Sequence, residues 1–480
     1  MNYSLTHNKK LNTYRWILVI PFGIAISSTA FINPLITLIL LGATSIVTLS
    51  IFRPHVPYLF AILLISYISI EIRIWGDYRT FFNLSEPFIL YCLLIWFISR
   101  GLRISTEDFQ IKRYLPLLLL FVWGIISILW STEKTMGAYY MAMFFIAICF
   151  FFLTIVNLNS FLKIKIAIAF FVGMGFVSSI VCYYSLISNK TIEDILYHYN
   201  EHLIRFVFNP EQMLRGQGFM HPLATAYYLS LSLMLLLGFI YTGNKLTKFF
   251  LSIIAIVIFV ALLTTLSKGP LLSLLFGLYI FTIINASVNK HVIIVWTLIF
   301  SLIVIGFFLS RIPTNDFAKA LDYTSKTSTE TTDESSSLGS RIKRWKKGIL
   351  SIKGHYGLGG GSGGFFTYLD PEICFDNLYV HIFAEYGLVG ALLWLWFLIL
   401  SCKRFIQAYI SCISSEYKKW MQIYISGVGT LLLNAVTSFS HTFLPLWFYL
   451  GIGHAMAIAI DRENNKRLEN ERMDTLKCRS

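Results

Sequence analysis

Long apolar runs separated by short polar segments make up most of the chain. These runs lie at 16–32, 34–52, 56–75, 85–99, 115–131, 136–156, 164–187, 222–241, 249–267, 269–286, 291–310, 378–401, 421–440 and 443–460. A membrane-spanning helix needs about 20 mostly apolar residues. The pattern therefore predicts an all-α polytopic membrane protein with about 12–14 transmembrane helices.

The composition agrees with the pattern. Of the 480 residues, 56% are hydrophobic and 13% are charged, whereas soluble domains carry roughly 25% charged residues. Basic residues precede the first run without a small-residue cleavage site, so we expect an uncleaved first span. The scattered cysteines contain no CxxC pair and predict neither a disulfide framework nor a metal site.

The distribution of basic residues predicts the orientation. With a cytoplasmic N-terminus, 23 of the 39 Lys and Arg residues fall in cytoplasmic segments, and nine of the other 16 fall in one long outer segment. Cytoplasmic loops of membrane proteins collect Lys and Arg. We therefore expect both termini in the cytoplasm, and we assign the net charge of +14 to these loops and not to nucleic-acid binding.

Two polar segments interrupt what we expect to be a single multi-pass domain over residues 1–480. The segment 188–221 forms a first predicted outer loop, and the segment 311–377 forms a larger one. The larger segment begins with a Ser/Thr-rich stretch, continues with a basic stretch and ends with a glycine-rich stretch. Long loops between closely spaced spans often carry function.

The two segments and the following span contain an ordered set of motifs. They are Arg215-Gly-Gln-Gly-Phe-Met-His221, Gly339-Ser-Arg341-Ile-Lys-Arg344, Gly359-Gly-Gly361-Ser-Gly-Gly364, Asp376-Asn377 and Glu385-Tyr-Gly387-Leu-Val-Gly390. Their order and spacing resemble the superfamily of O-antigen ligases and O-antigen polymerases, over roughly residues 120–400.

This resemblance implies a GT-C-like membrane glycosyltransferase in the bacterial inner membrane, active on the periplasmic face. Its donor and acceptor would be glycans, the donor carried on undecaprenyl pyrophosphate, for O-antigen, capsule or exopolysaccharide synthesis. It implies inverting transfer without a metal or other cofactor. Other expected partners are membrane lipids, a chain-length regulator and a flippase of the same pathway, and no nucleic acid.

One departure from the family pattern bears on the reaction. Ligases of the family carry His-Asn, nine residues and then Gly-x-x-Gly. Here Asn377, Gly387 and Gly390 keep that frame, while Asp376 stands in place of the histidine. An Asp-Asn pair looks more like the polymerase branch, so we favour a polymerase and keep as the alternative a ligase that transfers the glycan to lipid A core or another acceptor.

The resemblance assigns three catalytic roles. Transfer places negative charge on the leaving pyrophosphate, which Arg215 and Arg341 would stabilise with two-pronged hydrogen bonds. Asp376 would accept the proton of the attacking hydroxyl. The alternatives are structural: loop arginines can face water or lipid head groups, and Asp-Asn before an apolar run is a common helix N-cap.

A second set of residues is predicted to bind substrate. Lys268 interrupts an apolar stretch between two spans, where it could neutralise the pyrophosphate or reach phospholipid phosphates instead. His381 and Glu385 are four residues apart and share a helix face. The whole set is Lys268, Asn377, His381, Glu385, Arg344, His221, Gly359 and Gly361.

Three further patterns carry less weight. The glycine run fits GxGxxG, but no βαβ unit surrounds it, so a flexible or tightly turning loop against a sugar chain is favoured over nucleotide binding. His198 and His202 have metal-ligand spacing without an evident third ligand. Trp123 and Trp130 are expected in an aromatic belt at the membrane surface.

Proteins of other classes also have many spans. A flippase for lipid-linked oligosaccharides would show internal repeat symmetry and ionisable residues at mid-membrane. In this chain the charges concentrate in two unequal loops and no repeat is evident. A non-catalytic scaffold would explain the hydrophobicity but not the ordered arginine, glycine and Asp-Asn motifs.

Overall fold

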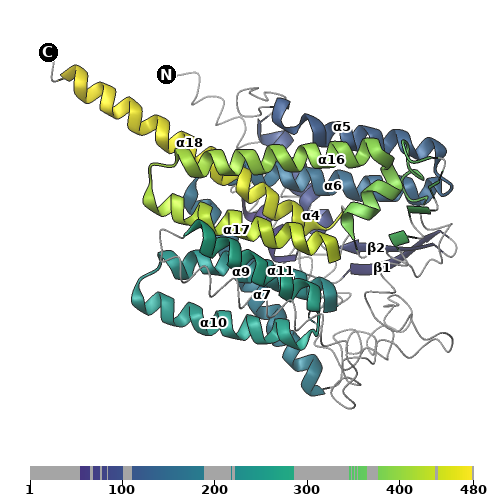
Figure 1. Cartoon of the computed structure of the whole chain (residues 1–480), viewed down its shortest axis with the longest axis horizontal. Coiled ribbons are helices and arrows are strands. Elements are labelled where there is room, and N and C mark those ends of the chain that lie inside the picture. Colours follow the sequence, from purple (N-terminus) through teal and green to yellow (C-terminus); the bar gives the residue numbers. More distant parts are fainter. Residues whose placement is uncertain are drawn as a thin grey trace, which may run out of the picture.

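The protein is a helical bundle, shown as a computed structural model in Figure 1. The structure describes residues 55–64, 69–75, 78–83, 85–100, 111–188, 218, 222–285, 345–346, 349–350, 352–353, 355–364, 377–437 and 442–477. The helices are α3 (His55–Leu64), α4 (Ser85–Arg100), α5 (Ile111–Ser127), α6 (Lys134–Asn157), α7 (Phe161–Ser188), α9 (Pro222–Thr242), α10 (Lys245–Thr264), α11 (Lys268–Ile284), α16 (Leu378–Ser411), α17 (Ser415–Thr437) and α18 (Leu444–Lys477).

Short described connections join α5 to α6, α6 to α7, α9 to α10, α10 to α11 and α16 to α17, so the two helices of each of these pairs run antiparallel. One 3-10 turn, η1 (Ile128–Trp130), follows α5 before α6 begins. We call the end of the bundle where α6, α16 and α18 begin the site end, and the opposite end, where α18 extends beyond the bundle, the tail end (Figure 1). The turn between α10 and α11 places the start of α11 at the site end as well.

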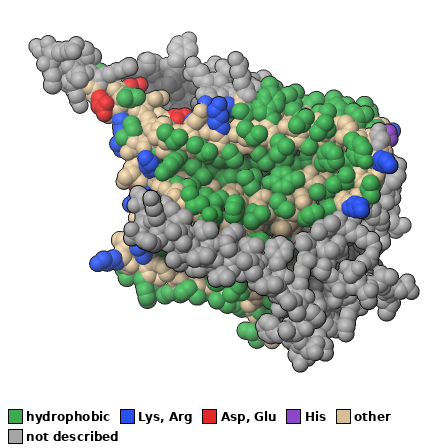
Figure 2. All heavy atoms as spheres, in the orientation of Figure 1, with side chains coloured by type: hydrophobic (Ala, Val, Ile, Leu, Met, Phe, Trp, Pro, Cys, Tyr) green, Lys and Arg blue, Asp and Glu red, His purple; other side chains and the backbone are tan. Residues whose placement is uncertain are grey.

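Seven of the described helical segments are long and apolar enough to cross a membrane. They are Arg113–Trp130, Lys134–Asn157, Phe161–Ile187, Pro222–Thr242, Lys245–Thr264, Leu378–Ser411 and Leu444–Glu471. Hydrophobic side chains cover the middle of the visible face, and Lys and Arg side chains lie toward its two ends (Figure 2). The prediction of an all-α polytopic membrane protein is confirmed.

Most predicted spans coincide with helices. The spans 85–99 and 269–286 correspond to shorter apolar helices, and the span 421–440 corresponds to α17. The spans 16–32, 34–52 and 291–310 lie outside the described residues.

The predicted span at 56–75 is wrong. The helix α3 ends at Leu64, and β1 (Ser69–Trp75) pairs antiparallel with β2 (Tyr78–Asn83) in a hairpin. The reason lies in the sequence Ser-Ile-Glu-Ile-Arg-Ile-Trp, where polar and apolar residues alternate with a period of two. This period favours a strand over a helix.

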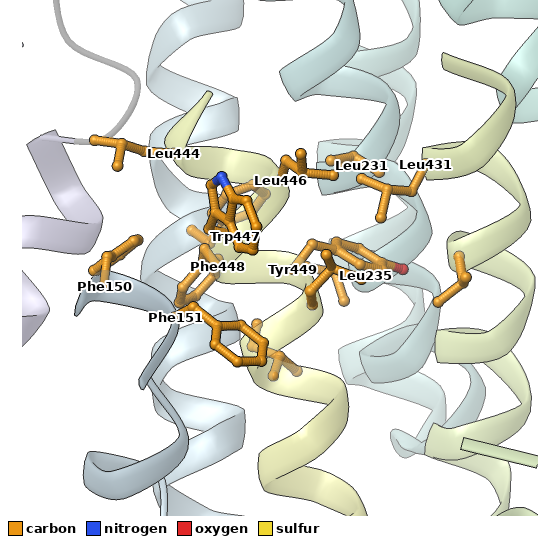
Figure 3. Packing of buried hydrophobic residues seen from close by; sticks show 14 of the residues in the cluster. Phe150, Phe151, Leu231, Leu235, Leu431, Leu444, Leu446, Trp447, Phe448 and Tyr449 are labelled. Atoms are coloured by element: carbon orange, nitrogen blue, oxygen red, sulfur yellow. The ribbon is translucent and has the colours of Figure 1, made fainter. Parts of the chain in front are cut away.

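The core of the bundle is aromatic and centres on α18. The buried residues Trp447, Phe448 and Tyr449 of α18 lie between side chains of α6 and α9 (Figure 3). The ring of Trp447 lies 5.6 Å from Phe144 and 5.9 Å from Trp394 of α16, measured between ring centroids. This packing fixes α16 against α18, and α16 is the helix that carries the candidate site.

Candidate active site at the kink of α16

The first turn of α16 is fixed by Asn377. Its side-chain oxygen accepts hydrogen bonds from the backbone N–H groups of Tyr379 and Val380, at 3.0 and 3.1 Å. Asn377 is therefore the N-cap, a role in which asparagine satisfies otherwise unpaired helix donors. The structural reading of the Asp-Asn pair applies to Asn377, and Asp376 lies outside the described residues.

The helix α16 is interrupted nine residues after its start. Gly387 has φ 63° and ψ −162°, a backbone conformation outside the helical region. Only glycine adopts it without strain, because a side chain would collide with the backbone. Kinks in helices commonly occur at glycine, and this kink breaks the regular hydrogen bonds between residues on either side of it.

A neighbouring loop replaces those hydrogen bonds. We call residues 355–364 the glycine loop. The N–H groups of Gly360 and Gly361 donate to the carbonyl oxygens of Ala384 and Glu385 at 2.8 and 2.9 Å, and the N–H of Leu388 donates to a carbonyl of the loop, that of Tyr356, at 2.8 Å. Because a bilayer supplies no water, every backbone group in a span needs a partner in the protein. The loop and the kink are therefore one structural unit.

The glycines of the loop allow this close approach. Gly359 and Gly361 have positive φ angles of 76° and 84°. A Cβ atom on Gly359 would lie 2.4 Å from the carbonyl oxygen of Glu385, and one on Gly361 would lie 2.6 Å from that of Ser127. Both glycines contact protein backbone here, so their predicted binding of substrate stays a prediction.

The N–H groups of residues 359–364 in the glycine loop all donate to protein acceptors. From 359 to 364 the acceptors are, in order, carbonyl oxygens of His355, Ala384 and Glu385, the Ser127 hydroxyl, the Glu385 carboxylate and the Gly361 carbonyl. A phosphate-binding loop instead directs its N–H groups toward the ligand. The loop turns tightly, its N–H groups are already bonded within the protein, which argues against phosphate binding by them, and its contact with a sugar chain stays a prediction.

The helices α5 and α6 hold the loop from its other side. The Ser127 hydroxyl accepts from the N–H of Ser362 at 3.0 Å, and the Ser362 hydroxyl donates to the carbonyl of Gly137 at 3.3 Å. A Cβ on Gly137 would lie 2.4 Å from the carbonyl oxygen of Ser362. The second half of the loop, 361–364, is buried, while residues 355–358 are exposed.

Trp123 of α5 also contacts the kink of α16. Its indole N–H donates to the carbonyl oxygen of Tyr386 at 2.9 Å, one of the carbonyls next to the break. Its ring lies 5.6 Å from that of Trp130, between centroids. The sequence placed Trp123 in an aromatic belt and gave no sign of this contact, because the broken ladder at Gly387 creates it.

The carboxylate of Glu385 connects the loop with the start of α16. Glu385 is fully buried, and its Oε1 accepts from the N–H of Gly363 at 3.2 Å. Its Oε2 lies 3.3 Å from Nε2 of His381, one turn earlier on the same helix. The His381 side chain is 7% exposed. Ionisable residues inside a span are uncommon and usually functional.

Three of the predicted site residues meet beside the kink, namely Glu385, Gly359 and Gly361. His381 lies one turn before Glu385, and Asn377 caps the start of the same helix. Lys268 begins α11 at the same end of the bundle, where its neighbour Gly269 packs against Thr437 of α17. The other predicted residues lie outside the described part of the chain: Arg215, His221, Arg341, Arg344 and Asp376.

Ser127, Gly137, Ser362 and Tyr386 were not predicted from the sequence. Tyr386 is fully buried, and its hydroxyl lies 3.7 Å from the Met141 sulfur. Their shared feature is contact with the glycine loop or the kink, which single residues in apolar helices do not reveal. Within the described residues, no group of three His, Cys, Asp or Glu side chains could hold a metal ion.

A family comparison covers this region. Residues 253–395 match the family model described as O-antigen ligase. The match begins in α10 and ends in α16, so it includes the glycine loop, the cap at Asn377 and the kink at Gly387.

This match makes residues 253–395 similar to the O-antigen ligases and supports the O-antigen ligase/polymerase superfamily. A search of curated proteins gave no match. The family points to a multi-pass membrane enzyme with glycosyltransferase-type activity on lipid-linked glycans. The kink and the buried part of the glycine loop lie at the site end, next to the buried carboxylate of Glu385 and the imidazole of His381.

Proposed function

We propose that this protein polymerises oligosaccharide repeat units carried on undecaprenyl pyrophosphate, at the periplasmic face of the bacterial inner membrane. The family match supports the class of enzyme. The position of the N-cap residue Asn377 at the start of α16 supports the choice of this site. Asn377 caps α16 one helical turn before His381, which lies beside the buried Glu385, and Asp376 precedes Asn377 in the sequence.

The identity of residue 376 favours polymerisation. An Asp-Asn pair at the start of this span resembles the polymerase branch, where ligases carry His-Asn. The ligase reading remains the second candidate, because the matching family model bears the ligase description. The two enzymes would share one bond-breaking step and differ in the acceptor.

The reaction transfers a glycan from the carrier to a sugar hydroxyl. The acceptor oxygen forms a bond to C1 of the donor sugar, and the bond from C1 to the phosphate oxygen breaks with its electron pair. A single displacement inverts the configuration at C1. Asp376 accepts the hydroxyl proton, while Arg215 and Arg341 stabilise the departing pyrophosphate through charged hydrogen bonds.

The other predicted residues surround this centre in the proposal. Lys268, Arg344 and His221 add positive charge or hydrogen bonds to the pyrophosphate, and Asn377 fixes the helix that carries Asp376. The segments 188–221 and 311–377 form periplasmic loops, and both termini lie in the cytoplasm. A chain-length regulator and a flippase are the expected partners in the pathway.

Lipid-linked glycans from a deletion strain test this function. A host that lacks the gene should accumulate single repeat units on the carrier, and so should strains that carry Asp376→Ala or Arg341→Ala. A strain that carries Lys466→Ala, an exposed residue of α18 at the tail end, should make normal polysaccharide.

Each of the other possible outcomes of this experiment points to a different conclusion. Long chains that remain on the carrier would show a ligase. Single units trapped on the cytoplasmic side would show a flippase. Normal polysaccharide in both site variants would show that the proposed residues are wrong.

A further inference from the structure

Large apolar side chains are exposed where the glycine loop meets α16. Tyr356 and Leu358 of the loop are 41% and 46% exposed, and Leu388 of α16 is 52% exposed. The N–H of Leu388 donates to the carbonyl of Tyr356 at 2.8 Å. The N–H of the next residue, the exposed Val389, donates to the carbonyl of Gly357. We call the exposed residues Tyr356, Leu358, Leu388 and Val389 the loop patch.

The part of α16 that follows the kink has a lipid-facing side. Its exposed apolar residues are Leu388, Leu392, Leu395, Trp396 and Ile399. Residues three and four apart lie on one face of a helix. Trp394 and Phe397 on the other side are buried in the bundle. Because α16 is long and apolar enough to cross a membrane, its exposed face contacts lipid, and the loop patch continues this face at the site end.

Two helices give the depth of the glycine loop in the membrane. The exposed Lys403 of α16 lies near the opposite membrane surface, since a charged side chain is costly inside the hydrocarbon core. From Leu388 to Lys403 the helix rises about 22 Å, less than the core thickness of about 30 Å. In α6, the rise from Gly137, which contacts Ser362 of the loop, to the last residue Asn157 is about 30 Å. Both helices therefore place the glycine loop at the edge of the hydrocarbon core.

The exposed half of the loop is suited to this depth. The carbonyl groups of His355, Tyr356 and Gly357 accept hydrogen bonds from protein N–H groups, and the N–H groups of His355 and Leu358 donate to protein carbonyls. Non-helical backbone at membrane depth requires such partners, because the hydrocarbon offers none. Tyrosine is enriched at the boundary between hydrocarbon and head groups, since its ring is apolar and its hydroxyl is polar.

We propose that the loop patch is a lipid-binding surface, occupied by phospholipids of the membrane leaflet at the site end. Acyl chains contact Leu358, Leu388 and Val389, and the ring of Tyr356 lies at the level of the head groups. The surface holds the glycine loop, and through it the kink of α16, against the bilayer. Lipid contact here does not depend on the proposed reaction, so its failure would leave the proposed function unchanged.

Photo-crosslinking of the full chain in native membrane vesicles tests this surface. The photoreactive residue p-benzoylphenylalanine replaces Tyr356 in one variant and Leu358 in another. Irradiation joins it to C–H groups that it touches. Mass spectrometry of the purified protein then identifies the partner and the yield per folded protein. Two loop positions keep the test usable if one of the variants fails to fold.

Two exposed apolar residues of the same chain are matched controls. Phe249 is 62% exposed on α10, a helix long and apolar enough to cross the membrane. Met473 is 57% exposed in the charged part of α18 that extends beyond the bundle (Figure 1). We expect phospholipid adducts at Tyr356 and Leu358 with yields similar to that at Phe249, and severalfold higher than at Met473.

Three results would overturn the proposal. The first is a lack of lipid adducts at both loop positions while Phe249 forms them. The second is an adduct with another protein or with another segment of this chain, which would then cover the loop patch in place of lipid. The third is an adduct with a polyprenyl carrier alone, which would make the loop patch a substrate contact.

Discussion

The helix bundle holds a buried histidine near each of its ends, and their surroundings differ. At the site end, His381 lies beside the buried Glu385 carboxylate on a kinked helix. At the tail end, Nε2 of His454 lies 3.1 Å from the hydroxyl oxygen of Ser401 on a regular part of α16. Both side chains are buried.

The tail-end histidine is part of an aromatic core. Its ring centroid lies 5.0–5.5 Å from those of three aromatic rings, namely Tyr114, Phe151 and Phe405. Next to it, a guanidinium N–H of Arg404 donates to the carbonyl of Ala457 at 3.1 Å, and Arg404 also pairs with Asp461. These contacts join α5, α6, α16 and α18.

The two buried histidines have different kinds of surroundings. Aromatic packing and a neutral hydroxyl hold His454 as a structural side chain. His381 instead lies beside the carboxylate of Glu385, and Glu385 contacts the glycine loop next to the helix break. Burial alone does not separate the two sites, but the charge of the nearest partner does.

The largest expected effect comes from replacing the glycine at the kink of α16. In Gly387→Ala, the new Cβ would lie 2.5 Å from the carbonyl oxygen of Gly357 and from the backbone nitrogen of Gly359. We expect a loss of about 3 kcal/mol or more, from the left-handed backbone and the steric clash. The glycine loop should detach, which limited proteolysis of detergent-solubilised protein would detect.

Gly173→Ala in α7 is the matched control. No atom lies within 4 Å of the Cβ position there. Alanine is the better helix former by roughly 0.5–1 kcal/mol, so stability should stay the same or rise. Equal protease resistance of Gly387→Ala and the unmodified protein would refute the joint role of loop and kink.

The next largest effect on stability belongs to the tail end. His454→Ala leaves a cavity among three aromatic rings, at a cost of roughly 3 kcal/mol. We expect a lower unfolding temperature in detergent and less protein in the membrane, with unchanged turnover per folded molecule. A change in turnover per folded molecule would mean that the two ends are functionally coupled, against the comparison.

The sequence predicted the fold better than the details of the site. Apolar runs placed most spans, because a bilayer demands long helices whatever the side chains. The start of α16 at residue 378 followed from the Asp-Asn pair, although Asn377 and not Asp376 is the cap seen here. The predicted span at 56–75 is wrong because the run is long enough for a span, while the alternation of polar and apolar residues in its second half favours a strand.

The parts of the site that depend on long-range backbone contacts could not be predicted from the sequence. His381 and Glu385 could be paired from their spacing of four residues. The role of Gly387 at the kink could not be predicted, because a glycine in an apolar run does not show whether the helix bends there. The contacts of Ser127 and Ser362 join residues 235 positions apart, and local patterns carry no information about such a pair.

The smallest structural effect, and the sharpest contrast in function, is expected from two exposed lysines. Lys268 begins α11 at the site end, and Lys245 begins α10 at the tail end. Both are exposed first residues of apolar helices, so Lys268→Gln and Lys245→Gln should leave the unfolding temperature unchanged. In the proposed function, Lys268 attracts the carrier pyrophosphate and Lys245 has no part in binding it.

We therefore expect Lys268→Gln to raise the KM for lipid-linked repeat units severalfold and Lys245→Gln to leave it unchanged. The increase should shrink at high salt, because screening weakens the attraction of an exposed lysine for phosphate. Chain extension in vesicles at two ionic strengths measures both effects. Equal KM values for the two variants would mean that Lys268 reaches bulk phospholipids instead, and charge at the site end would then come from the arginines alone.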